Sequence, residues 1–282
     1  MAVVSTKRAI ITRMSALYLL LLLIAIVAIA LNYRKWRIQY VLSKPFPTSW
    51  KKVVERRLPF FHNFPVELQR QLLDRIQLFI SRMKFYGCNG QEINDEIRVT
   101  IAAEACLLLL NRKTRIYPGL RYILVYPSAF KTNSDQHNPD GTVSRVRLGM
   151  LGQSWSNGKI ILSWDDVEHG IENFHDGNNV VLHEFAHQLD SESGSTNGAP
   201  RLIKNSYQTW AKTLSSEFET LVQARDHHLK SVMDYYGSTN PAEFFAVCTE
   251  TFFEKPRQLF ETHAELFEEL KTYYCVDPRL WE

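Results

Sequence analysis

The chain has 282 residues, of which 45% are hydrophobic and 12% aromatic, and its formal net charge at pH 7 is only +3. This length and composition allow one or two domains with a sizeable buried core. The small net charge argues against nucleic acid as a partner, as does the lack of a basic run interleaved with aromatic residues in the body of the chain.

The first predicted element is an apolar helix over residues 14–31, MSALYLLLLLIAIVAIAL, which contains no charged residue. A helix of this length extends about 27 Å, close to the ~30 Å hydrocarbon core of a bilayer. The alternative is a signal peptide cleaved after Ala30, but the mature chain would then begin with the strongly basic LNYRKWRIQY. Basic residues after the helix outnumber those before it, which places the C-terminal part in the cytoplasm. We therefore predict a single-pass anchor in a bacterial cell membrane.

Four segments follow from this prediction. They are a short tail at 1–13, the transmembrane helix at 14–31, a basic linker at 32–49 and one domain at 50–282. Pro45 and Pro47 lie near the end of the linker, where they break any continuing helix.

The domain is predicted to be mostly helical with a small sheet. Apolar periodicity indicates helices that open near Asn63 and Asn94. Runs of β-branched and aromatic residues at 121–127 and 159–164 indicate strands, with a polar, Gly- and Asn-rich stretch at 131–158 between them. Further helices are expected around residues 180–190, 206–224 and 241–254, and a last one ends near Tyr274. Many helices and few strands predict an α+β fold.

Residues 180–190, VVLHEFAHQLD, contain an H-E-x-x-H motif. Residues four apart lie on one face of a helix, so His183 and His187 can bind one tetrahedral zinc ion. Glu184 can then reach a water on that ion and act as a general base. The alternative is a core helix with two hydrogen-bonded histidines. The apolar neighbours favour the metal, because two buried imidazoles and a carboxylate are costly without a shared partner.

A third ligand is needed, and two glutamates compete for this role. The pattern H-E-x-x-H-x-x-G-x-x-H is excluded, because the chain has Asp190 and Ser193 where that pattern requires Gly and His. Asp190 is expected either to orient a ligand imidazole or to be a solvated carboxylate at the end of the helix. On the helix at 241–254, Glu243 and Glu250 share one face, and Glu243 is also placed to form a capping box with Asn240. Spacing alone leaves the two glutamates nearly equal.

Three segments carry a resemblance to a known family. They are QSWSNGKIILSW, HEFAHQLD and NPAEFFAVCTETFF, in this order. Together they resemble the Mlc titration factor A family of zinc-dependent peptidases, whose catalytic core is similar to that of the anthrax lethal factor protease. The resemblance covers roughly residues 50–275, and the apolar N-terminus is not part of it.

The resemblance implies a zincin-like (gluzincin) metallopeptidase domain with one zinc ion per chain. The implied ligands are His183, His187 and Glu243, the glutamate of Pro-Ala-Glu. Glu184 falls on the general base, and Tyr236 stands at the tyrosine that precedes the ligand glutamate by seven residues. Tyr236 is expected to donate a hydrogen bond to the reacting oxygen, although Tyr235 beside it could instead be the residue that faces the site.

Two functions of different class remain open. The first is a membrane-anchored zinc peptidase that acts on a peptide or protein substrate through a zinc-activated water and Glu184. The second is a binding module of the same fold that sequesters a transcriptional regulator, because one family member binds and titrates the glucose repressor Mlc. The intact base favours the peptidase, since a pure binding module has no need of Glu184.

Overall fold

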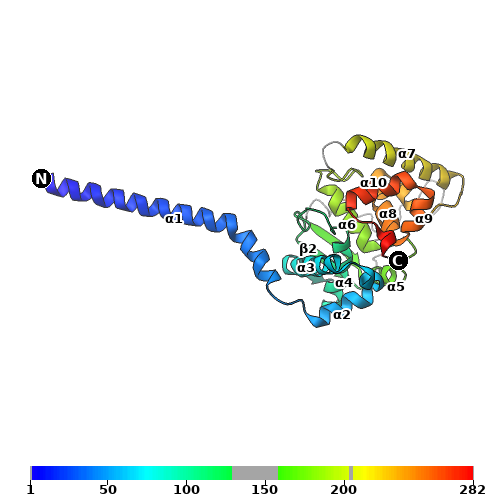
Figure 1. Ribbon diagram of the computed structural model, residues 1–282, viewed down its shortest axis with the longest axis horizontal. Helices are drawn as coiled ribbons and strands as arrows, with labels where there is room; N and C mark the ends of the chain where they lie inside the picture. Colours follow the sequence, from blue (N-terminus) through cyan, green and yellow to red (C-terminus); the bar gives the residue numbers. More distant parts are fainter. Residues whose placement is uncertain (1, 129–157, 203–205, 282) are drawn as a thin grey trace. The chain divides into compact units, whose positions relative to one another are not determined.

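The structure is a computed structural model that describes residues 2–128, 158–202 and 206–281, with side chains from Leu21 onward (Figure 1). The chain forms two compact units, Met1–Pro45 and Phe46–Glu282. The polar stretch predicted at 131–158 lies, apart from Gly158, outside the described residues.

The helix α1, Ala2–Leu42, makes up most of the first unit. Among its described side chains the apolar run ends at Leu31, before Asn32 and a basic segment. Within the described residues, no helix combines the length and the apolar character needed to cross a membrane. This finding overturns the predicted single-pass location in a bacterial cell membrane, with its spanning helix at 14–31.

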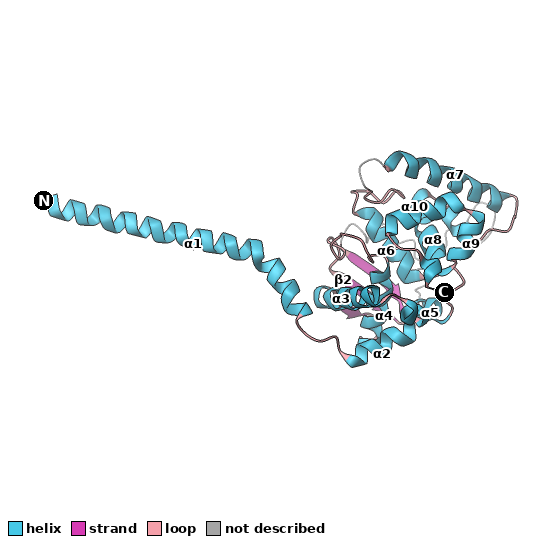
Figure 2. Ribbon diagram, in the orientation of Figure 1, coloured by secondary structure: helices cyan, strands magenta, loops and turns pink. Residues whose placement is uncertain are grey.

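The second unit contains the other elements, and helices dominate it (Figure 2). The residues predicted as a basic linker, 32–49, include the end of α1 and the start of α2. The α-helices are α2 (Thr48–Arg57), α3 (Val66–Arg82), α4 (Asp95–Leu107), α5 (Trp164–Glu172), α6 (Val180–Ser191), α7 (Tyr207–Asp226), α8 (Pro241–Glu254), α9 (Pro256–Thr262) and α10 (Ala264–Tyr274). Among the described residues there are also short 3-10 helices, η1 (Pro59–Asn63), η4 (Tyr235–Ser238) and η5 (Pro278–Leu280).

Three parallel strands form the sheet, in the order β1 (Lys84–Gly87), β2 (Tyr122–Tyr126), β3 (Lys159–Ser163). Parallel neighbours need a crossover connection, and α4 lies in the one between β1 and β2. Alternate residues of β2 and β3 are buried, as expected of strands that pack one face on a core. The two longer strands were predicted, whereas β1 was not, because its four mostly exposed residues show no alternation. The predicted helix-rich α+β class with a small sheet is confirmed.

The helices α6 and α8 pack against each other in the core of the second unit. α8 is buried on all sides, and Glu243 is the one residue between Ala242 and Glu254 that is partly exposed. Its phenylalanines join an aromatic cluster, in which Phe245 lies 5.8 Å from the rings of both Trp210 and Tyr273. Its glutamates lie on the side of α6. Since buried carboxylates are costly without partners, the interface between α6 and α8 has to supply them.

Candidate metal centre

The helix α6 places two imidazoles side by side. Asn179 caps the helix, and its side-chain oxygen accepts hydrogen bonds from the backbone N–H groups of Val181 and Leu182 at 3.1 and 3.0 Å. One turn apart on the same face, the rings of His183 and His187 lie 4.7 Å from each other. Their Nε2 atoms approach to 3.1 Å, so both rings point to the same spot.

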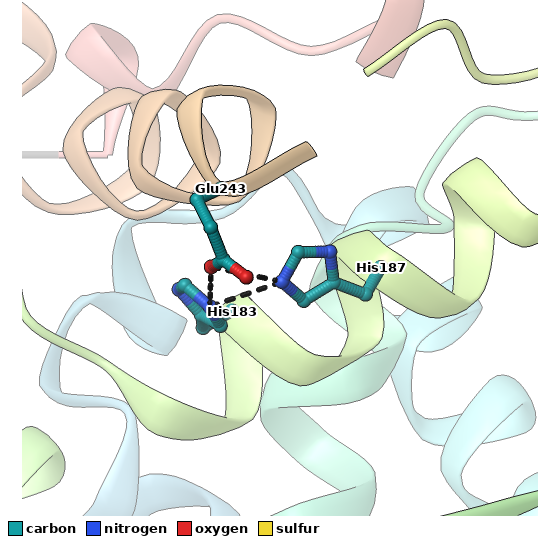
Figure 3. Close-up of side chains that lie close together, drawn as sticks. All are labelled: His183, His187 and Glu243. Carbon is teal, nitrogen blue, oxygen red and sulfur yellow. Dashed lines mark hydrogen bonds and ion pairs between the residues drawn. The ribbon is translucent and has the colours of Figure 1, made fainter. Parts of the chain in front are cut away.

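The helix α8 brings a carboxylate to that spot. The side chain of Asn240 caps α8 by accepting from the N–H groups of Ala242 and Glu243, both at 3.0 Å. Glu243 reaches from the first turn of α8 toward the two rings (Figure 3). Its Oε2 lies 3.0 Å from Nε2 of His183 and 3.3 Å from Nε2 of His187. Glu243 therefore faces the histidines, whereas a capping box would have turned its carboxylate back to Asn240.

The three donor atoms have the spacing of a metal site. Their separations are 3.0, 3.1 and 3.3 Å. Donors at about 2.0–2.1 Å from a tetrahedral ion lie about 3.3–3.4 Å apart, so the triangle matches one face of such a coordination sphere to within a few tenths of an ångström. Two neutral imidazoles and a carboxylate are also ligands that a divalent metal ion accepts. His183, His187 and Glu243 thus fit a metal ion in both geometry and donor chemistry.

The electrostatics of the cluster favour a cation. Burial lowers the pKa of His183, but the carboxylates of Glu250 and Glu243 overcome this and raise it well above its usual range. Burial lowers the pKa of His187 to about 4, so this ring is neutral with an available lone pair. Burial opposes ionisation of Glu243, yet its hydrogen bonds with the two histidines bring its pKa down to about 2. Ionised carboxylates around a neutral imidazole are stabilised by a positive ion.

Glu250, the competing third ligand, lies on the other side of His183. Its Oε1 is 2.7 Å from Nδ1 of His183, and its Oε2 accepts from the backbone N–H of Asn179 at 2.5 Å. The two nitrogens of His183 thus face different carboxylates, Nδ1 that of Glu250 and Nε2 that of Glu243. The structure therefore separates the two glutamates: Glu243 meets the Nε2 atoms, and Glu250 orients one ring from behind.

A further buried carboxylate continues this network. Glu104 of α4 accepts from the side-chain amide of Asn179 at 2.9 Å, so Asn179 connects the cap of α6 with both Glu104 and Glu250. Sequence reasoning did not identify Glu104, Asn179 or the orienting role of Glu250. An Asn directly before an apolar helix is a capping signal that could have located Asn179. Glu104 lies in the mostly apolar second half of the helix 95–107, and the local sequence gives no indication of its partner, which comes from another element.

The two residues predicted to act on the substrate lie next to the histidines. Glu184 is buried on α6, and its charge adds to those that raise the pKa of His183. Tyr236, in η4, is half-buried with its ring centre 5.9 Å from that of His183. Tyr235 is exposed by contrast. Of the two adjacent tyrosines, Tyr236 is thus the one beside the metal centre.

Asp190 is not the solvated carboxylate that was one of its two expected roles. It is fully buried, and its Oδ2 accepts from the backbone N–H of Gly198 at 2.7 Å. Burial raises the pKa of this carboxyl to about 6, although backbone N–H groups from the loop 197–199 pull it down. Asp190 therefore holds the loop that follows α6.

Comparisons with known proteins find a metallopeptidase family and related chains. The model of the family described as Glucose-regulated metallo-peptidase M90 matches residues 32–275. An uncharacterized protein of Synechocystis sp. is 41% identical over 250 residues, which cover 88% of this chain and 90% of that protein. The Mlc titration factor A of Escherichia fergusonii is 27% identical over 248 residues, 87% of this chain and 92% of that protein. The Mlc titration factor A of Cronobacter sakazakii is 28% identical over 237 residues, with coverages of 83% and 88%.

Proposed function

The chain belongs to the glucose-regulated metallo-peptidase M90 family, and from this premise we propose that it is a zinc-dependent peptidase. The observation that carries the proposal is the convergence of His183, His187 and Glu243 on one point. Two imidazoles and one carboxylate in a tetrahedral arrangement are a ligand set of catalytic zinc sites in peptidases, which leave one position open.

His183, His187 and Glu243 would hold the ion. A zinc ion there would supply a Lewis acid for the scissile carbonyl and would lower the pKa of a water molecule to ~7. With the ion bound to Nε2 of His183, Nδ1 would donate its proton to Glu250, which lies 2.7 Å away. Burial keeps His187 neutral, with a lone pair available to bind the ion.

Glu184 would be the general base. It follows the first ligand on α6 and is buried beside it. Its carboxylate would accept a proton from the attacking water and then deliver it to the amine that leaves. Tyr236 would donate a hydrogen bond from its hydroxyl to the carbonyl oxygen as negative charge develops there. Its place next to the ring of His183 supports this role.

A second candidate function is binding of a transcriptional regulator. It is favoured by the name of the two enterobacterial relatives, Mlc titration factor A. A binding function of this kind requires a surface and not a proton acceptor at the metal. The two functions therefore respond differently to loss of Glu184.

The test uses the full chain and a library of peptides. We expect hydrolysis that stops on addition of a chelator and returns with zinc. Glu184→Gln should keep the metal but lose turnover by at least ~10²-fold, since removal of a base costs about this much. Turnover of Glu184→Gln at the wild-type rate would refute the assignment of the base. A zinc-loaded wild-type chain that cleaves no peptide in the library would favour the binding function.

A further inference from the structure

Gly198, in the loop between α6 and α7, is held from three sides. Its N–H donates to Oδ2 of Asp190 at 2.7 Å, and its carbonyl accepts from Nε1 of Trp210 at 3.0 Å. Its φ is +78°, and a Cβ atom placed on it would lie 2.3 Å from the carbonyl oxygen of Pro241. Only glycine fits both this conformation and this close approach.

Each of the three contacts leads to the metal centre or to its neighbour helix. Asp190 lies on α6, three residues after His187. Pro241 is the first residue of α8, two residues before Glu243. Trp210 lies on α7, and its ring packs 5.8 Å from that of Phe245 on α8. One residue therefore joins the end of α6, which carries a proposed metal ligand, to the beginning of α8, which carries another.

We propose that Asp190, Gly198 and Trp210 form a clasp that positions Glu243 relative to His187 for metal binding. The proposal rests on the proposed function, because it assumes that these two residues are ligands. The ligand atoms of His187 and Glu243 are 3.3 Å apart but belong to residues 56 positions apart in the chain. Glu243 is the third residue of α8, so a shift of the first turn of this helix moves the carboxylate directly. The clasp acts on that turn through Pro241.

The burial of Asp190 is explained by this role. A buried carboxylate is costly unless it makes strong hydrogen bonds, and a charged acceptor makes stronger ones than a neutral group. Here the bond ties a loop to the helix of the H-E-x-x-H motif. Trp210 closes the same loop from the opposite side with a buried indole N–H. Outer residues that hold ligands in place commonly change metal affinity by about 10–100-fold when they are replaced.

The test compares two glycines of the same loop. Gly198→Ala introduces a methyl group against Pro241. Gly194→Ala is the matched control, because Gly194 also has a positive φ, +108°, but a Cβ atom placed on it would meet no other atom within 4 Å. Zinc affinity of the full chain is measured by competition with a chelator. The absorption spectrum of the cobalt-loaded protein reports the ligand geometry, and unfolding of the metal-free protein reports stability.

We expect Gly198→Ala to bind zinc about 10–100-fold more weakly than wild type, with an altered cobalt spectrum. Gly194→Ala should bind within about twofold of wild type, whatever its loss of stability. Trp210→Phe keeps an aromatic ring and removes the N–H, and it should also weaken zinc binding. If Gly198→Ala does not fold, Trp210→Phe tests the clasp alone.

Two results would overturn the clasp while leaving the metal site intact. One is wild-type affinity and an unchanged cobalt spectrum in Trp210→Phe and in folded Gly198→Ala. The other is an equal loss of affinity in Gly194→Ala, which would assign the effect to strain in the loop. A wild-type chain that binds no zinc would instead refute the proposed function, and the clasp with it.

Discussion

At the scale of single residues, His183 joins two carboxylates through the two nitrogens of one ring. Glu250 lies at 2.7 Å from Nδ1, and Glu243 at 3.0 Å from Nε2. Of the two nitrogens, Nε2 is the one that lies beside both His187 and Glu243. A carboxylate behind a ligand imidazole fixes the ring orientation and makes the ligand more basic.

This arrangement predicts different outcomes for the two glutamates of α8. Glu250→Ala should weaken zinc binding by about 10–100-fold, since the ring of His183 loses its support, but the ligands stay. Affinity is measured by chelator competition, with Glu265→Ala on the exposed side of α10 as the control. Complete loss of zinc from Glu250→Ala would make Glu250 a ligand, and unchanged affinity would remove its orienting role.

The adjacent tyrosines allow a matched pair of variants. Tyr236→Phe should lower kcat, by up to about 10²-fold, with little change in KM or zinc content, because its hydroxyl acts mainly in the transition state. Tyr235→Phe, at an exposed neighbouring position, should leave all three quantities unchanged. Steady-state kinetics and metal analysis distinguish these outcomes. A fall of kcat in Tyr235→Phe alone would exchange the two assignments.

At the scale of elements, α8 holds the N-terminal end of α6 in place with its glutamates. One turn after Glu250 on α8, Glu254 accepts hydrogen bonds from the backbone N–H groups of Gly177 and Asn178 at 2.8 and 3.1 Å. Asn179 links the same turn to Glu104 of α4. Burial raises the pKa of Glu104 to about 8 and that of Glu254 to about 9. Both carboxyls are therefore protonated at neutral pH in the metal-free protein.

The raised pKa of Glu104 predicts how the free energy of unfolding depends on pH. Its pKa is raised on folding from 4.5 to about 8, so the folded state holds a proton that the unfolded state has lost in this interval. Its contribution to the free energy of unfolding is thus full below pH 4.5, falls by up to ~1.4 kcal/mol per pH unit as pH rises, and levels off above pH 8. Glu104→Gln should remove this dependence.

The measurement is denaturant unfolding of metal-free wild type and Glu104→Gln between about pH 5 and pH 8.5, the interval in which the two protonation states differ. As the pH rises, the free energy of unfolding of Glu104→Gln should increase relative to that of the wild type. Comparing the two proteins cancels the contributions of Glu254 and other groups that both share. Parallel curves for the two proteins would contradict the prediction.

The same elements show which features local sequence can predict. The spacing of four residues in HEFAH places His183 and His187 together because helix periodicity is a local property. Glu243 and Glu250 remained tied because they share a face of α8, and two turns separate them along its axis. Only the packing of α6 against the first turns of α8 assigns each glutamate to a different nitrogen of His183. The partner of Asp190 was missed for a similar reason, since it lies in a loop with no periodicity.

At the scale of the whole molecule, the family relationship is confirmed and extends further than the motifs indicated. The match to the family model begins at residue 32, inside α1, whereas the resemblance was expected from about residue 50. The predicted location in a membrane is wrong for the part of the chain that the structure describes. That prediction relied on the hydrophobicity of residues 14–31 and on the basic residues that flank them.

The central claim is that His183, His187 and Glu243 bind one zinc ion, and metal analysis of the purified full chain tests it most directly. The chain is loaded with zinc, excess metal is removed, and zinc is counted per protein. We predict one zinc per wild-type chain and little or none in His183→Ala and Glu243→Ala, with Glu265→Ala equal to wild type. No bound zinc in the wild type, or full occupancy in Glu243→Ala, would contradict the account.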